Sequence, residues 1–169
     1  TLTFMCGGTK NAFDAAKPYL DIMGGKIVHC GDGGAGQAAK ICNNMLLAVS
    51  MIGTCEAFAL AEKLGLSKEA AFQVMSTSSG SCWSVNTYCP VPGVGPNTPA
   101  DNGYMPGFSA DLMLKDASLA QQAANEVGQA TPIGQYATML YQHFVANGGE
   151  GKDFSGIIEY LKTAQRGSA

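Results

Sequence analysis

A single lysine, Lys40, lies at the start of a long apolar segment, and its position suits proton transfer. No charged residue occurs between Lys40 and Glu56. Early in a helix, an ammonium group faces the positive end of the helix dipole, and burial among apolar side chains also disfavours its charged form. Amines whose charge is disfavoured serve as general acids and bases. We therefore predict Lys40 to be a buried proton-transfer group.

Two asparagines follow Lys40 within the same predicted helix. Asn44 lies at i+4 from the lysine, with Asn43 beside it. Asparagine is a poor helix former, so we expect both side chains to make specific hydrogen bonds. A plainer interpretation stays open, in which Lys40 extends into solvent at a domain edge and the asparagines satisfy nearby backbone groups.

A second group of charged residues begins another predicted helix. Asp111 and Lys115 are four residues apart, a spacing typical of a surface ion pair worth roughly a few tenths of a kcal/mol. Asp116 shares a helical stripe with Leu112 and Leu119, which predicts a partly buried carboxylate with a partner. A solvated helix start is the alternative.

The segment from Gly31 to Gly36 matches G-x-G-x-x-G, and Glu56 lies 20 residues past Gly36. A dinucleotide-binding unit needs a second strand that carries the acid at its end. Here the helical pattern continues past Glu56 to Leu64, which leaves no room for that strand. We therefore reject the dinucleotide interpretation and predict a hinge and a close-packed helix start.

Composition excludes several other functions. The net charge of −3, with only 10 Lys and Arg residues, argues against nucleic acid. The uncharged run is shorter than the roughly 20 residues that a membrane-spanning helix needs. The six cysteines form no C-x-x-C pair, and there are two histidines, so zinc-site spacing is absent. We expect these thiols to be small buried groups in a reducing compartment.

The spacing Gly33-x-x-Gly36-x-x-x-Lys40-x-x-Asn43-Asn44 resembles a signature of the β-hydroxyacid dehydrogenase family. The block GFSADLMLKDASLAQ is similar to a later segment of that family, and the opening TLTFMCGG to the last stretch of its N-terminal domain. The loop CPVPGVGP resembles an insertion typical of the family's 3-hydroxyisobutyrate dehydrogenases. The resemblance spans nearly the whole chain.

The resemblance implies a role for five residues. Lys40 matches the catalytic lysine, and Asn44 the asparagine that contacts substrate. Phe108 matches an aromatic residue of the substrate and nicotinamide site, Lys115 a lysine that reaches the cofactor, and Asp116 an acid that helps order the site.

The elements that must position these residues are mainly helical. Residues 1–32 have a β-α-β pattern, with strands over Leu2–Met5 and Lys26–Cys30, and we interpret them as the C-terminal remnant of a Rossmann domain. Residues 33–169 are predicted to form an all-helical catalytic and dimerisation domain, built on a long buried helix. The resemblance implies a fold like the C-terminal domain of 6-phosphogluconate dehydrogenase.

The family implies oxidation of 3-hydroxyisobutyrate, or a close 3-hydroxy acid, to its semialdehyde with NAD. The chain has no initiator Met and starts inside a predicted strand, so we expect a preceding Rossmann domain that binds most of the cofactor. Alone, the chain is expected to be inactive. Its low charge suits a dimer or tetramer, in bacterial cytoplasm or the mitochondrial matrix. The alternative is a non-catalytic oligomerisation or binding module that keeps the family fold.

Overall fold

The computed structural model describes residues 2–164, which divide into two compact units. The first unit extends to Asn44, and the second begins at Met45. The division falls inside helix α2 (Ala35–Lys63), because the first turns of that helix pack against a strand of the first unit. The domain boundary predicted at Gly33 stays a prediction.

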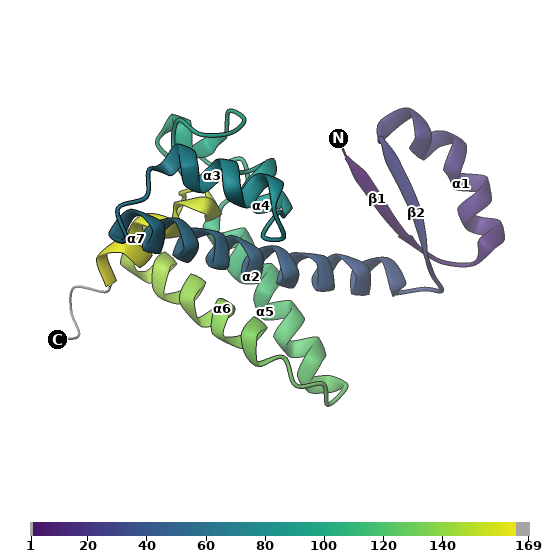
Figure 1. The fold of residues 1–169 in the computed structure, drawn as a ribbon. Coiled ribbons are helices and arrows are strands. Elements are labelled where there is room, and N and C mark those ends of the chain that lie inside the picture. Colours follow the sequence, from purple (N-terminus) through teal and green to yellow (C-terminus); the bar gives the residue numbers. More distant parts are fainter. Residues whose placement is uncertain (1, 165–169) are drawn as a thin grey trace. The chain divides into compact units, whose positions relative to one another are not determined.

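The first unit is the expected β-α-β element. Strands β1 (Thr3–Gly7) and β2 (Lys26–Gly31) pair in parallel, and helix α1 (Lys10–Met23) connects them (Figure 1). The side chain of Thr9 caps α1 by accepting a hydrogen bond from the amide of Ala12 at 3.3 Å.

Glycines let the start of α2 approach β1 closely. A Cβ atom on Gly36 would lie 2.3 Å from the carbonyl oxygen of Met5, and one on Gly7 would lie 2.8 Å from that of Asp32. Backbone atoms of the protein itself occupy the space beside both glycines. The predicted close-packed helix start is therefore present.

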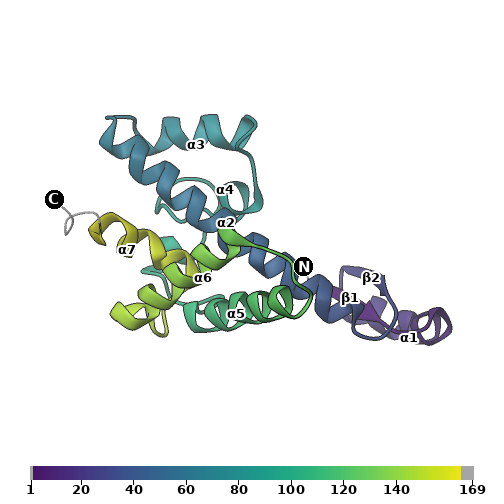
Figure 2. The same ribbon diagram turned by 90° about the horizontal axis from the view of Figure 1, so that it is seen from below.

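The second unit is helical, as predicted, and α5 and α6 lie side by side in both ribbon views (Figures 1 and 2). After α2, its elements are α3 (Lys68–Thr77), α4 (Trp83–Asn86), the 3-10 turn η1 (Pro99–Asn102), α5 (Ala110–Glu126), α6 (Pro132–Phe144), the π turn η2 (Val145–Gly149), the 3-10 turn η3 (Phe154–Gly156) and α7 (Ile157–Ala164).

Serine hydroxyls cap two helices of the second unit. The hydroxyl of Ser67 accepts from the amide of Ala70 at the start of α3. Ser109 caps α5 in the same way. Thr131 precedes α6, but its hydroxyl does not cap the helix and donates to the side-chain oxygen of Gln121 at 2.9 Å.

Helix α2 is buried along part of its length, whereas the sequence predicted burial throughout. Met51 and Cys55 are fully buried in the core of the second unit, but Leu46 and Leu60 are exposed. By length and apolar composition alone α2 could cross a membrane. The core helix of a folded domain meets the same criteria, and the burial of Met51 and Cys55 against other helices fits that description.

The buried carboxylate of Asp153 joins three segments of the second unit. Its Oδ2 accepts hydrogen bonds from the hydroxyl of Tyr88 at 2.9 Å and from the amides of Gly107 and Phe108 at 3.0 Å. Its Oδ1 accepts from the amide and the hydroxyl of Ser155 at 3.0 and 2.6 Å. Asp153 is 0% exposed, so these donors replace water around the charge.

Replacing Gly36 with alanine should destabilise the first unit. The new methyl group would collide with the Met5 carbonyl, and such overpacking costs about 1–3 kcal/mol. Gly53→Ala is the matched control on the same helix: it has open space around it and should gain roughly 1 kcal/mol from helix propensity. Urea unfolding followed by circular dichroism measures both, and a Gly36→Ala chain as stable as the parent would contradict the packing argument.

Replacing Asp153 with asparagine should lower the free energy of unfolding by about 3 kcal/mol, because an amide nitrogen would face backbone N–H donors. Asp21→Asn, at an exposed ion pair with Lys17, should change it by less than about 1 kcal/mol. Equal effects in thermal melts would show that the Asp153 network does not hold the unit together.

Candidate active site

Lys40 and Asn44 lie one turn apart on α2 and line the same pocket. This open pocket has a volume of about 450 Å³. All of its wall belongs to the first unit and comes from β1 and the first turns of α2. Its lining residues are Thr3, Phe4, Met5, Gly7, Gly36, Gln37, Lys40 and Asn44.

Lys40 itself is exposed, whereas the sequence predicted a buried amine. Gly36 and Lys40 are four residues apart and therefore share one face of the helix. Gly36 is covered by β1, but Lys40 borders the open pocket one turn further on. The predicted relation to the asparagine at i+4 is present, and the predicted burial is wrong for this chain.

The adjacent asparagine makes a specific hydrogen bond, as expected for its position in a helix. The side-chain nitrogen of Asn43 donates to the side-chain oxygen of Asn44 at 3.1 Å. That bond helps to orient the Asn44 amide, which lines the pocket together with Lys40. A hydroxyl or carboxylate ligand beside Lys40 would meet an ammonium or amine group and an amide at i+4.

The glycine-rich segment before these residues leads into a continuous helix. Helix α2 runs without interruption past Glu56, so the second strand of a dinucleotide-binding unit does not follow. Because Gly36 has no side chain, the carbonyl of Met5 packs directly against it. The uninterrupted helix on which the rejection of the G-x-G-x-x-G match rests is present.

Lys115 and Asp116 form a pair near the start of α5. The side chain of Asp116 is 4% exposed and that of Lys115 is 59% exposed, and Lys115 Nζ lies 3.5 Å from Asp116 Oδ1. The predicted burial of Asp116 is confirmed. For Asp111 we expected an ion pair with Lys115. Its Oδ2 instead accepts a hydrogen bond from the amide of Gly151 at 3.0 Å. An exposed cation held beside a buried carboxylate can contact a phosphate or carboxylate ligand.

Phe108 immediately precedes the capping residue of α5 and is half-buried. Its amide is held by Asp153, and its ring packs edge-on against Phe154 with centroids 5.7 Å apart. The structure thus groups Lys40 with Asn44 in the first unit, and places Phe108, Lys115 and Asp116 around the start of α5 in the second.

Three further residues of the second unit, which the sequence analysis did not select, are linked to Phe108: Trp83, Tyr88 and Asp153. Trp83 is 48% exposed and stacks on Tyr88, which donates to Asp153. Burial and this hydrogen bond raise the pKa of Tyr88, so the phenol stays protonated and remains a donor. Among these three residues only the tryptophan stands out in the sequence, because Asp153 has the pattern of an ordinary helix cap.

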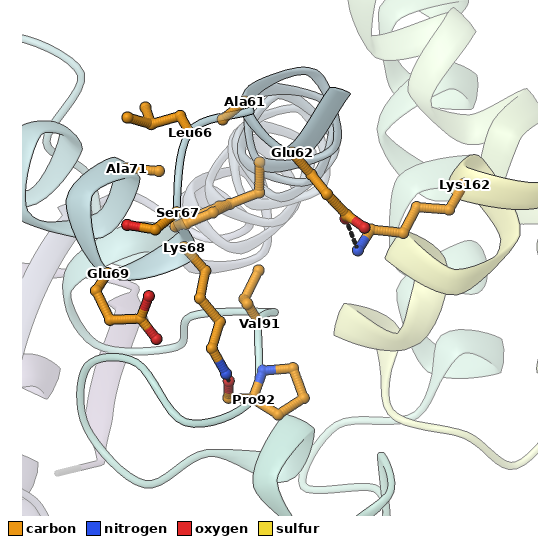
Figure 3. A pocket seen from close by; sticks show the side chains of 11 residues that line it. Ala61, Glu62, Leu66, Ser67, Lys68, Glu69, Ala71, Val91, Pro92 and Lys162 are labelled. Atoms are coloured by element: carbon orange, nitrogen blue, oxygen red, sulfur yellow. Dashed lines mark hydrogen bonds and ion pairs between the residues drawn. The ribbon is translucent and has the colours of Figure 1, made fainter. Parts of the chain in front are cut away.

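A separate pocket lies in the second unit and contains none of the predicted site residues. Its volume is about 460 Å³, and apolar side chains from α2, α3 and the segment around Val91 form its floor. Figure 3 shows Lys162 paired with Glu62 at its rim, while Lys68 donates to the carbonyl of Pro92 at 2.8 Å. Both cations are therefore already engaged by the protein.

The thiols and carboxylates do not gather into a metal site within residues 2–164, where no group of three or more His, Cys, Asp and Glu side chains could hold an ion. The six cysteines are free thiols. Cys55 and Cys89 are buried as expected, and burial raises the pKa of both, but Cys42 is exposed.

Comparison with known proteins agrees with this fold. Residues 34–161 match a family model described as the NAD-binding domain of NADP-dependent 3-hydroxyisobutyrate dehydrogenase. A probable 3-hydroxyisobutyrate dehydrogenase of Mycobacterium bovis is 50% identical over 96% of this chain and 55% of its own length. The human mitochondrial 3-hydroxyisobutyrate dehydrogenase is 47% identical over 95% of this chain and 48% of its own length.

Solved structures give the same result. A structure of Mycobacterium tuberculosis 3-hydroxyisobutyrate dehydrogenase with L-serine matches 96% of this chain and 56% of that chain, with 50% identity and a TM-score of 0.92. A Salmonella typhimurium 3-hydroxyisobutyrate dehydrogenase, at 24% identity and a TM-score of 0.76, supports the fold alone.

The chain spans about half the length of the relatives it matches. Because the family model matches most of the chain, and a relative of that name superposes on nearly all of it, the chain belongs to the 3-hydroxyisobutyrate dehydrogenase family.

Proposed function

We propose that this chain is the C-terminal part of an NAD(P)-dependent enzyme that oxidises 3-hydroxyisobutyrate or a close 3-hydroxy acid to its semialdehyde. The observation that carries the proposal is the pairing of Lys40 with Asn44 at one pocket, within a chain of this family. The L-serine named with the mycobacterial relative supports the substrate class, since serine is also a small carboxylic acid with a hydroxyl group at its third carbon.

Lys40 acts as the general base in this proposal. Its neutral amine accepts the proton of the substrate hydroxyl as the carbon–oxygen bond becomes a carbonyl, and the ammonium group returns the proton in the reverse reaction. The nicotinamide cofactor, when bound, accepts the hydride from the same carbon. Asn44 holds the substrate by hydrogen bonding, Phe108 and Asp116 shape the site, and the exposed Lys115 contacts the cofactor.

The preceding Rossmann domain is the proposed source of most cofactor contacts. Support comes from the glycine-rich segment of this chain, whose close contacts are made to its own backbone. The description of the matched family leaves NAD and NADP both open as the cofactor. The compartment proposed is a reducing one, the cytoplasm of a bacterium or the mitochondrial matrix, in line with the mitochondrial human relative and the free thiols.

Oligomerisation through the helical domain is proposed as part of the enzyme's function, and also as the alternative role for a chain without catalysis. Helix α6 exposes Ile133, Tyr136 and Met139, which recur every three residues along one stripe. We expect a second copy of the protein to cover this stripe in a dimer or tetramer.

Replacing Lys40 with alanine in the full-length protein should reduce kcat at least about 100-fold, because the hydroxyl proton loses its acceptor. Lys63→Ala is the matched control, since it removes an exposed lysine from the last turn of the same helix. Steady-state oxidation of 3-hydroxyisobutyrate, followed by NADH or NADPH absorbance, measures both. Near-normal turnover of the Lys40 variant would refute the catalytic assignment, and would favour the non-catalytic alternative.

The chain of residues 1–169 alone should bind neither NAD nor NADP tightly. We expect no saturation in calorimetric titrations at concentrations up to about 1 mM, because Lys115 alone gives only weak contact with the cofactor. The full-length protein is the positive control. Micromolar binding by the isolated chain would place the main cofactor site in this domain.

A further inference from the structure

The pocket beside Lys40 contains a polar side chain to which the proposed reaction gives no role. Gln37 lies three residues before Lys40 on α2, and the two residues line the pocket together with Asn44. The spacing i, i+3 and i+7 places these three side chains on one face of the helix. Gln37 is exposed, and among the residues that the structure describes its side chain makes no hydrogen bond or ion pair. Its amide is therefore available to a ligand in the pocket.

Gln37 also lies at the end of α2 that favours an anion. The helix begins at Ala35, so Gln37 is in its first turn, where backbone amides have no carbonyl partner within the helix and the helix dipole is positive. No acidic residue occurs in that first turn. Asp32 precedes the helix in sequence but is absent from the lining of the pocket. A carboxylate ligand at this end of the pocket would meet an amide donor and a favourable dipole.

A short 3-hydroxy acid has a polar group for each end of this helical face. Its hydroxyl is the group that reacts beside Lys40, and its carboxylate is at the opposite end of the molecule. Residues three apart on a helix have Cβ atoms about 5–6 Å apart, a separation that such a molecule can span. With the hydroxyl at Lys40, the helix dipole favours the carboxylate on the side of Gln37 and disfavours it further along α2.

We propose that Gln37 is a substrate-binding residue that selects for an acid, its side-chain N–H groups donating to the substrate carboxylate while Lys40 acts on the hydroxyl. The inference rests on the proposed dehydrogenase function. The carboxylate does not change during the reaction, so its contact with Gln37 is the same in the bound substrate and in the transition state. Such a contact lowers KM and leaves kcat unchanged.

Gln37→Met tests the contact, because it keeps the length of the side chain and removes the amide. In the full-length enzyme we expect KM for 3-hydroxyisobutyrate to rise about fivefold, with kcat changed by less than about twofold. Gln73→Met is the matched control, since Gln73 is an exposed glutamine of α3 in the second unit. It should leave both constants unchanged.

Gln37→Glu tests the charge of the ligand without relying on turnover. A second carboxylate beside that of the substrate should weaken binding, and we expect the calorimetric Kd for 3-hydroxyisobutyrate to rise at least about 20-fold. Gln73→Glu adds the same charge in the second unit and should leave Kd unchanged. An acidic side chain in the first turn of a helix is stabilising, so Gln37→Glu should remain folded, which thermal melts check.

An unchanged KM in Gln37→Met together with an unchanged Kd in Gln37→Glu overturns the assignment. A loss confined to kcat in Gln37→Met overturns it as well, because Gln37 would then act on the proton transfer at Lys40. If the parent enzyme binds 3-hydroxyisobutyrate without oxidising it, the proposed function fails, and the Kd values of Gln37→Glu and Gln73→Glu still decide the role of Gln37. A parent enzyme that does not bind the acid refutes both proposals.

Discussion

A carboxylate taken out of water must have hydrogen-bond donors around it, and in the second unit that requirement falls on Asp153. Five donor groups from Tyr88, Gly107, Phe108 and Ser155 converge on its two oxygens. Unsatisfied, a buried charge costs several kcal/mol. The fold must therefore keep the loop before α5, the turn before α7 and the ring of Tyr88 in one place. The hydrogen bond from the Phe108 amide to Asp153 therefore fixes the position of the segment that carries Phe108.

Local patterns predicted those parts of the structure that depend on neighbouring residues. The caps at Ser67 and Ser109 are local features of this kind, because a cap involves atoms only three residues apart. The length of α2 and the absence of a strand after Glu56 followed from the helical pattern in the same way. The burial of Asp116 was predicted for the wrong reason: Leu112 and Leu119, on whose stripe the prediction rested, are exposed, and the buried residues of α5 around it are Met113, Ala117 and Ala120.

Long-range partners could not be predicted. The donors to Asp153 include Tyr88 and Phe108, which are 65 and 45 residues away, and nothing near Asp153 in sequence distinguishes it from an ordinary cap. The prediction that Lys40 is buried failed for a different reason. The apolar run around it predicted burial, but whether an apolar helix is enclosed depends on what packs against each turn, and at Lys40 the neighbour is an open pocket. Composition describes the helix and leaves its surroundings undetermined.

The sheet of the first unit has a practical consequence for anyone who isolates this chain. Within the described residues, β1 and β2 pair only with each other, so each strand presents one outward edge of amide and carbonyl groups. Such edges are templates for strand addition, and β1, with Phe4 and Met5, carries little charge to discourage it. A longer protein can cap these edges with further strands of its own sheet. Purified alone and concentrated, the chain is prone to aggregate edge to edge through this sheet.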